Sequence, residues 1–571
     1  MYLDYKVKIP SSATGISRKT IKGVTYIYYT YSRTYDPSRK YTKPSCTSIG
    51  KCSEDDPDMM FPNVNYLRFF PDAELPESKD ESYRSGCLRI GTFLVIRRVI
   101  AEYRLDKIIG QIVGKDSGLF LDIAAYTIVS ENNAGQYYPD YAYCHPLFTE
   151  GMRIYSDSKV SDFINSISRD QCFAFQDEWN AGHNHRERIY ISYDSTNKNC
   201  QAGDIDFVEF GHPKERVGAP LVNYSVAYDC DNAVPLFYED YPGSIVDVSQ
   251  LQIMLEKARG YGYEDIGFIL DRGYFSEANI HYMDKCGYEF IIMMKGMKDL
   301  VRELVLEVKG SFEEKRENSI RSYKVSGTTV KRKLYPSDKK ERYFHIYYDE
   351  GKRGSEHEHL ESRIDQMAES LVKMEGKPYK NPGKGIRKYF ELLYINQGKE
   401  NERFSCAREK YEAINEEIKL CGYFVIITSE KMDAENALNK YKGRDVSEKL
   451  FRGDKSYLGN KSFRIQSDES MHAKIFIEFV ALIIRDRIHT LLKEQIQKAG
   501  KKQNYMNVAA AVRELEKIEL IRQADHNYRL DHAVTSTQKT ILAAFGMDAV
   551  SVRTQGIAIN DDLVTTKKKE A

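Results

Sequence analysis

Hydrophobic and polar residues change their spacing several times along the chain, and each change predicts a different kind of element. Residues 1–80 alternate loosely between apolar and polar positions, which predicts a small β-rich N-terminal region. From 85 to 185, apolar residues recur three and four positions apart, as in Phe93, Ile96 and Ile100. That spacing predicts a helical region.

Between residues 186 and 296 the pattern becomes a series of apolar strands and amphipathic helices. We expect strands at 188–194, 219–228, 234–241, 266–270 and 290–294, with helices at 248–258 and from Ser276 onward. Three strands, a helix and a fourth strand are the start of a ribonuclease-H-like mixed sheet, in which the first and fourth strands lie side by side. Asp194 and Asp271 end those two strands, so we expect them to be neighbours although 77 positions separate them.

The rest of the chain completes an α/β core and adds helices. The pattern of residues 297–420 predicts a β-rich insertion. An apolar strand then returns the chain to the α/β core. This core covers residues 186–296 and 421–490. Residues 491–571 predict a C-terminal helical region. The most apolar run, residues 475–484, contains Glu478 and is too short and too charged to cross a membrane, so we expect a buried helix.

The charge and the cysteine content indicate which binding partners and which cellular compartment to expect. Lys and Arg together number 84, as do Asp and Glu, so a nucleic acid would have to meet local basic patches. The N-terminal sheet is either a surface laid against DNA or a folding appendage, and the region 85–185 is a candidate DNA-binding domain. The ten cysteines form no CxxC pair and no Cys/His cluster, which predicts reduced cysteines in the cytoplasm.

The candidate chemistry centres on a pattern of the form Y-x2-R-x3-E-x6-K. Its members are Tyr441, Arg444, Glu448 and Lys455. On one continuous helix these offsets would fall within an arc of about 60°. A carboxylate suits a divalent metal, and the cations and the phenol suit phosphate oxygens. A charged, solvated helix face would explain the pattern equally well, and Gly443 weakens a continuous helix.

Further motifs occur in a fixed order before this pattern. They are Tyr193-Asp194-Ser-Thr, Gly211-His-Pro-Lys214-Glu-Arg216, Pro235-Leu236 with Glu239, Tyr241-Pro242-Gly243 followed by Asp247, and Asp271-Arg272-Gly273. With them, the chain resembles bacterial insertion-sequence transposases of the DDE type, in the branch marked by the Y-R-E-K signature. The resemblance covers roughly residues 85–550. It departs from the family pattern at Pro213, Glu215 and Ser244.

The resemblance implies a metal-dependent reaction on double-stranded DNA. Asp194, Asp271 and Glu448 would hold two Mg²⁺ ions, for which Mn²⁺ can substitute, with Asp194 bridging both. Water would cut the DNA at the terminal inverted repeats, and the freed 3′-OH would then attack the target. The expected DNA contacts are Tyr441, Arg444 and Lys455, and more weakly Lys214 and Arg216. A homodimer would form in the synaptic complex, in a bacterial cytoplasm and on the nucleoid when DNA is bound.

Two other functions use the same residues. One is a stand-alone metal-dependent nuclease, which cuts DNA without joining it, and analysis of the products separates it from a transposase. The other is a domesticated, inactive DNA-binding protein. The complete set of Asp194, Asp271 and Glu448 argues against the second alternative, because a binding protein has no need of three acids.

Overall fold

The structure is a computed structural model in which the chain forms two compact units. One unit contains residues 1–171, 457–459 and 476–571, and the other contains 172–456 and 460–475. The structure describes residues 2–3, 5–11, 14–37, 40–73, 75, 84–200, 205–211, 220–245, 247–294, 297–378, 383–398, 402–444, 462–463, 465, 467–500 and 503–570.

The first unit begins with an antiparallel sheet. Its strands are β1 (Val7–Lys8), β2 (Ile16–Ile21), β3 (Val24–Asp36), β4 (Tyr41–Cys52) and β5 (Met59–Pro62), in the order β1-β5-β4-β3-β2. One face carries fully buried Ile27, Ile49 and Met60 and packs against Tyr66 of helix α1 (Val64–Phe69). The sheet therefore has a small core of its own, as the alternating sequence predicted.

Helices make up most of the remaining part of the first unit. They are α2 (Gly91–Tyr103), α3 (Leu105–Val113), α4 (Ser117–Ser130), α5 (Tyr138–Cys144), α6 (Asp157–Ser166), α17 (Val508–Leu515), α18 (Ser536–Ala543) and α19 (Ala549–Glu570). A short sheet, β6 (Cys87–Arg89) with β19 (Glu519–Arg522) and β20 (Tyr528–Leu530), joins residues far apart in sequence. Helix α2 approaches α17 so closely that a Cβ on Gly91 would lie 2.2 Å from the carbonyl oxygen of Leu515.

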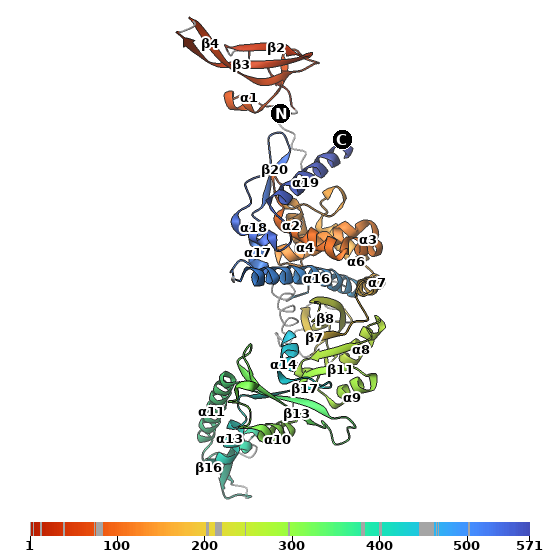
Figure 1. The fold of residues 1–571 in the computed structure, drawn as a ribbon, viewed down its shortest axis with the longest axis vertical. Coiled ribbons are helices and arrows are strands. Elements are labelled where there is room, and N and C mark those ends of the chain that lie inside the picture. Colours follow the sequence, from red (N-terminus) through yellow and green to blue (C-terminus); the bar gives the residue numbers. More distant parts are fainter. Residues whose placement is uncertain are drawn as a thin grey trace. The chain divides into compact units, whose positions relative to one another are not determined.

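The second unit is organised around a mixed sheet. Its order in the described residues is β12-β13-β14-β17-β11-β10-β7-β8-β9, with β18 (Ser462–Phe463) paired to the end of β7. The bounds are β7 (Ile189–Cys200), β8 (Leu221–Asp229), β9 (Val234–Pro242), β10 (Ile266–Leu270), β11 (Glu289–Met293), β12 (Ser319–Ile320), β13 (Val325–Arg332), β14 (Arg342–Tyr348) and β17 (Tyr423–Thr428). Strand β10 runs parallel to both β7 and β11, whereas β8 is antiparallel to β7 and β9 is antiparallel to β8. Figure 1 labels β7, β8, β11 and β17 of this sheet.

Helices cover both faces of this sheet. On β11, Ile291 packs in one cluster with Leu438 of helix α14 (Ala434–Gly443). The adjacent Phe290 lies under the guanidinium of Arg342, which pairs with Asp284 of helix α9 (Glu277–Cys286). Because successive side chains of a strand point to opposite faces, α14 and α9 lie on opposite sides of the sheet. Helix α8 (Asp247–Gly260) connects β9 to β10.

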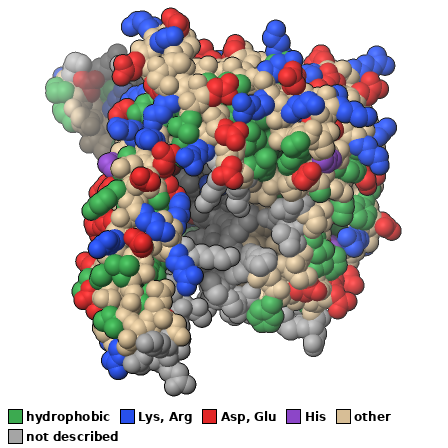
Figure 2. All heavy atoms as spheres, turned by 90° about the horizontal axis from the view of Figure 1, so that it is seen from below, with side chains coloured by type: hydrophobic (Ala, Val, Ile, Leu, Met, Phe, Trp, Pro, Cys, Tyr) green, Lys and Arg blue, Asp and Glu red, His purple; other side chains and the backbone are tan. Residues whose placement is uncertain are grey.

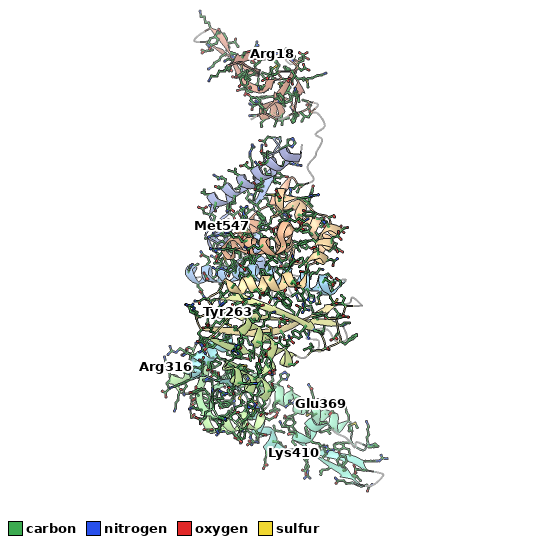
Figure 3. All side chains as sticks on the ribbon, turned by 90° about the vertical axis from the view of Figure 1, so that its right-hand side faces the viewer. Arg18, Tyr263, Arg316, Glu369, Lys410 and Met547 are labelled. Carbon is green, nitrogen blue, oxygen red and sulfur yellow. The ribbon has the colours of Figure 1, made fainter. Side chains whose placement is uncertain are left out.

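The insertion divides into two parts. Helix α10 (Lys298–Val308) precedes β12 to β14, and β14 pairs with β17, so these strands extend the central sheet. The second part has its own core around Leu360, Phe390 and Phe404. It consists of α11 (Glu350–Val372), α12 (Lys384–Tyr389), β15 (Phe390–Ile395), β16 (Arg403–Glu409) and α13 (Tyr411–Ile418), and Figure 3 marks Glu369 and Lys410 within it.

One expectation about local structure needs correction. Strand β7 does not end at Asp194 but continues to Cys200, because β8 pairs with it through Asn199 and holds its polar second half extended. The helix that carries Tyr441 ends at Gly443, the residue that weakened a continuous helix in the sequence, and Arg444 is its C-terminal cap.

The expectation of a buried apolar helix is confirmed. The apolar run at 475–484 lies in helix α16 (Asp468–Ala499) and is buried. Trp179 on α7 (Arg169–Ala181) is buried and donates its Nε1–H to the carbonyl oxygen of Pro235 at 2.9 Å. None of the described helices combines the length and the apolar character that crossing a bilayer requires.

Candidate active site

The register of strands β7 and β10 brings two predicted acids next to each other. These strands are parallel, and Leu270 is paired with Tyr193. Asp271 and Asp194 are the next residue on each strand, and the backbone of Asp271 is still extended, with φ −68° and ψ 154°. The two aspartates therefore lie side by side across the strand pair, as the sequence predicted.

Both acids belong to the same face of the sheet. Ile269 packs in the cluster that contains α14, and its register partner is Ser192. Asp271 and Asp194 each follow two positions later, and residues two apart on a strand share a face. The pair thus lies on the α14 side, where the carboxylates can act on one substrate.

The carboxylate of Asp271 is partly exposed and makes no local cap. Asp271 precedes the short helical turn Arg272–Tyr274, but its side chain accepts no hydrogen bond from that turn. Its side chain is 35% exposed, and Arg444 Nη1 lies 3.1 Å from its Oδ1. An aspartate that only formed the turn would use its oxygens there, so this geometry favours a ligand role. Asp194, also partly exposed, accepts from the backbone N–H of Ser195 at 2.9 Å.

The end of α14 positions Arg444. Asp433 caps the start of this helix by accepting from the N–H of Asn436, and the backbone N–H of Arg444 bonds to the carbonyl of Tyr441 at its end. The ring of Tyr441 is only 4% exposed and packs in the cluster beneath α14, with the Arg444 guanidinium 5.4 Å from its centroid. Tyr441 thus fixes the helix end that carries Arg444, and its direct contact with DNA stays a prediction.

Lys440 is a second cation on this helix that the sequence pattern did not include. It lies four residues before Arg444, a spacing that places both on one helix face. Its Nζ is 3.5 Å from the ring centroid of Tyr190 on β7. The i, i+4 spacing relative to Arg444 was the signal that could have identified it.

Four predicted site residues lie outside the described residues, namely Glu448, Lys455, Lys214 and Arg216. In the part of the chain that the structure describes, no group of three or more His, Cys, Asp or Glu residues is arranged to hold a metal ion. The structure therefore describes two of the three predicted acids, Asp194 and Asp271, and the catalytic role of all three stays a prediction.

Comparison with known families identifies the class of protein. A family model described as Transposase DDE domain matches residues 192–484, which is 293 of 571 residues and more than half of the chain. The chain belongs to this family. It is therefore a transposase, an enzyme of DNA transposition, and the match includes both Asp194 and Asp271. Enzymes of this family generally use divalent metal ions.

Solved structures of transposase complexes show only low similarity to this chain. The cryo-EM structure of a piggyBac transposase synaptic complex with hairpin DNA is 8% identical over 86% of this chain and 87% of that chain, with a TM-score of 0.34. The Mos1 transposase paired-end complex with the left transposon end is 10% identical over 40% of this chain and 65% of that one, with a TM-score of 0.14. No curated protein matches the chain.

Proposed function

We propose that this transposase mobilises a bacterial insertion sequence of the Y-R-E-K branch. It cuts double-stranded DNA at the terminal inverted repeats of the element by metal-dependent hydrolysis and joins the freed 3′-OH to target DNA. The observation that carries the proposal is the adjacency of Asp194 and Asp271 on one face of the sheet, with Arg444 beside them.

The strand arrangement supports a ribonuclease-H-like core. In the order β9-β8-β7-β10-β11, the first three strands alternate in direction and the last two run parallel to β7. That layout brings the middle of β7, the first of these strands in sequence, next to the end of β10, the fourth in sequence. The sequence predicted this layout from its β-β-β-α-β order.

The available donors fit Mg²⁺. Asp194 and Asp271 offer only carboxylate oxygens, the ligands that this hard cation prefers, and both side chains are accessible. With Glu448 as third acid, they would hold two Mg²⁺ ions, or Mn²⁺ in their place. When bound, such a pair activates water and stabilises the leaving oxygen of the phosphodiester.

The protein's own cationic side chains would contact the DNA phosphates. Arg444 orients the carboxylate of Asp271, and a guanidinium at this position suits phosphate oxygens in charge and geometry. Lys455, Lys214 and Arg216 are the further phosphate contacts of this proposal, and Tyr441 supports Arg444 from below. Two copies of the chain would hold the two ends of the element in one synaptic complex.

The test compares three proteins on labelled duplexes taken from the DNA that flanks the gene. Wild-type protein with Mg²⁺ should nick the end and join the 3′ end to a target plasmid. Asp271→Ala should do neither while still binding the duplex. Asp265→Ala is the matched control, since Asp265 lies at the other end of the same strand and also pairs with an arginine.

Each result has a defined meaning for the proposal. Equal nicking by Asp271→Ala and wild type would remove Asp271 from the mechanism. Nicking without joining would favour the stand-alone nuclease. Loss of activity in both variants would indicate a general structural effect rather than catalysis by Asp271.

A further inference from the structure

Strands β3 and β4 extend beyond the rest of the N-terminal sheet as a two-stranded ribbon. The pairing of β2 with β3 stops at Ile16 and Tyr29. Beyond Thr30, whose backbone N–H still donates to the carbonyl oxygen of Gly15, five residue pairs, from Ser32 with Ser45 to Asp36 with Tyr41, join β3 to β4 alone (Figure 1). At about 3.3 Å per residue the ribbon is roughly 17 Å long.

The ribbon is exposed on both of its faces. Residues 31–35 and 40–44 are all exposed, with Tyr35 58% and Tyr41 43% accessible. At its base Tyr31 stacks on Phe69 of α1 with the ring centroids 5.2 Å apart, and the guanidinium of Arg68 covers that ring. A two-stranded ribbon gains little stability without a covered face, so its length and exposure call for an explanation outside the core.

Charge distinguishes the ribbon from the opposite end of the same sheet. Residues 30–46 contain four cations and one acid, a net charge of +3. At the other end, the loop after β4 supplies Glu54, Asp55 and Asp58, which pair with Lys51 at 3.6 Å, Lys6 at 2.9 Å and Arg18 at 3.9 Å. Figure 3 marks Arg18 on this sheet.

Three cations of the ribbon differ from those at the other end of the sheet. Among the described residues, no ion pair involves Arg33, Lys40 or Lys43. Positive charge is thus concentrated at the ribbon, although the chain as a whole is neutral. Figure 2 shows Lys and Arg intermixed with Asp and Glu over another face of the molecule.

Each face of the ribbon carries one cation and one tyrosine, and the face of Lys43 and Tyr41 also carries Asp36. Lys43 pairs with Thr34, and Tyr41 pairs with Asp36 two positions along, which places Lys43 and Tyr41 on one face. Arg33 and Tyr35 occupy the opposite face by the same rule. Pro44 removes a backbone donor from the ribbon, which discourages the addition of a further strand from a protein partner.

We propose that this β3–β4 ribbon binds double-stranded DNA by entering the major groove. A B-DNA major groove is about 12 Å wide and admits a two-stranded ribbon. Inside the groove, cations on both faces of the ribbon lie near the phosphates of both walls, and the tyrosines lie near base edges and backbone. The proposal rests on the proposed function, because it assigns part of the DNA contact of a transposase to a surface separate from its acids.

The test measures the affinity of the full-length protein for a labelled mixed-sequence duplex in EDTA, over a series of salt concentrations. Arg33→Ala/Lys43→Ala should bind on the order of tenfold more weakly. Its plot of log affinity against log salt should be shallower by about 1.8, since each lost phosphate contact changes the slope by about 0.9. Lys6→Ala/Lys51→Ala removes the same charge from the other end of the sheet and should bind like wild type.

Circular dichroism melting of all three proteins checks that the sheet is intact. Equal affinity of Arg33→Ala/Lys43→Ala and wild type would overturn the ribbon proposal, as would equal weakening in both double variants. Tighter binding to a single strand of the same length than to the duplex would also overturn it. Cleavage by wild type but not by Asp271→Ala would uphold the proposed function in any of these cases, so the two proposals fail separately.

Discussion

The two ends of the β7–β10 strand pair place different charges side by side. At the amino end, Arg188 and Asp265 precede the paired residues Ile189 and Ile266, and their side chains form an ion pair at 3.3 Å. At the carboxyl end, Asp194 and Asp271 follow a paired position, so two like charges are adjacent. Opposite charges across neighbouring strands stabilise a sheet and like charges destabilise it. The carboxyl end therefore carries a like-charge pair that costs stability, and we attribute this pair to the proposed function.

The amino end is completed by further partners of Arg188. Its Nη2 lies 2.7 Å from Glu430, which also accepts from the hydroxyl of Tyr190. Burial and this hydrogen bond to Glu430 raise the pKa of Tyr190, so its hydroxyl stays protonated and donates at neutral pH. Asp265 and Asp271 each touch one arginine, so an ion pair alone does not distinguish the two ends. The second aspartate at the carboxyl end, Asp194, does distinguish them.

The largest expected effect is the loss of cleavage when either carboxyl-end acid is changed. Asp194→Asn and Asp271→Asn should each slow single-turnover cleavage by more than about 10³-fold, which corresponds to roughly 4 kcal/mol of transition-state stabilisation. The double variant should be no slower than either single one, because groups that act as a unit are not additive. Multiplicative losses would show that the two acids act independently.

A smaller effect separates the two arginines. Arg444→Ala should slow cleavage about 10- to 100-fold, because it loses one charged contact to the phosphate and to Asp271. Arg444→Lys should recover part of the rate, since the lysine ammonium keeps the positive charge but lacks the forked N–H donors of the guanidinium. Arg188→Ala should leave the rate of cleavage within about twofold of wild type. A loss in Arg188→Ala as large as that in Arg444→Ala would remove the distinction between the two ends.

The smallest effect concerns stability and has opposite signs at the two ends. Asp194→Asn relieves the repulsion from Asp271 and leaves the ion pair of Asp271 with Arg444 in place, so it should raise the free energy of unfolding by a few tenths of a kcal/mol. Asp265→Asn breaks an exposed ion pair and should lower it by no more than about 1 kcal/mol. Denaturant unfolding followed through the fluorescence of Trp179, which lies in the same unit as β10, measures both changes. The same sign in both variants would contradict the comparison.

Local sequence patterns predicted the strands and helices that bury strong apolar runs. Residues 266–270 are fully apolar apart from a glycine and form β10, and the spacing of Phe93, Ile96 and Ile100 corresponds to α2. The second half of β7 was not predicted, because Ser195 to Asn199 are polar and are held extended by distant β8. Pairing of the insertion strand β14 with β17 likewise depends on residues about 80 positions away, beyond any local pattern.

The site was predictable where strand order determines position. Asp194 and Asp271 could be placed together from the β-β-β-α-β order alone. The contact between Arg444 and Asp271 could not, because the helical reading of the Y-R-E-K pattern fails where α14 ends at Gly443. The burial of Tyr441 was also missed, since a tyrosine next to charged residues in the sequence is as compatible with an exposed position as with a buried one.

The central claim is that Asp194 and Asp271 share a divalent-metal site at the carboxyl end of β10, beside the middle of β7. Calorimetric titration of Mn²⁺ into the full-length protein tests it without any DNA. Wild type and Asp265→Asn should bind Mn²⁺ with the same affinity, and Asp194→Asn and Asp271→Asn should each bind at least about tenfold more weakly, as the loss of one carboxylate ligand implies. Equal Mn²⁺ affinity in wild type, Asp194→Asn and Asp271→Asn would contradict the account.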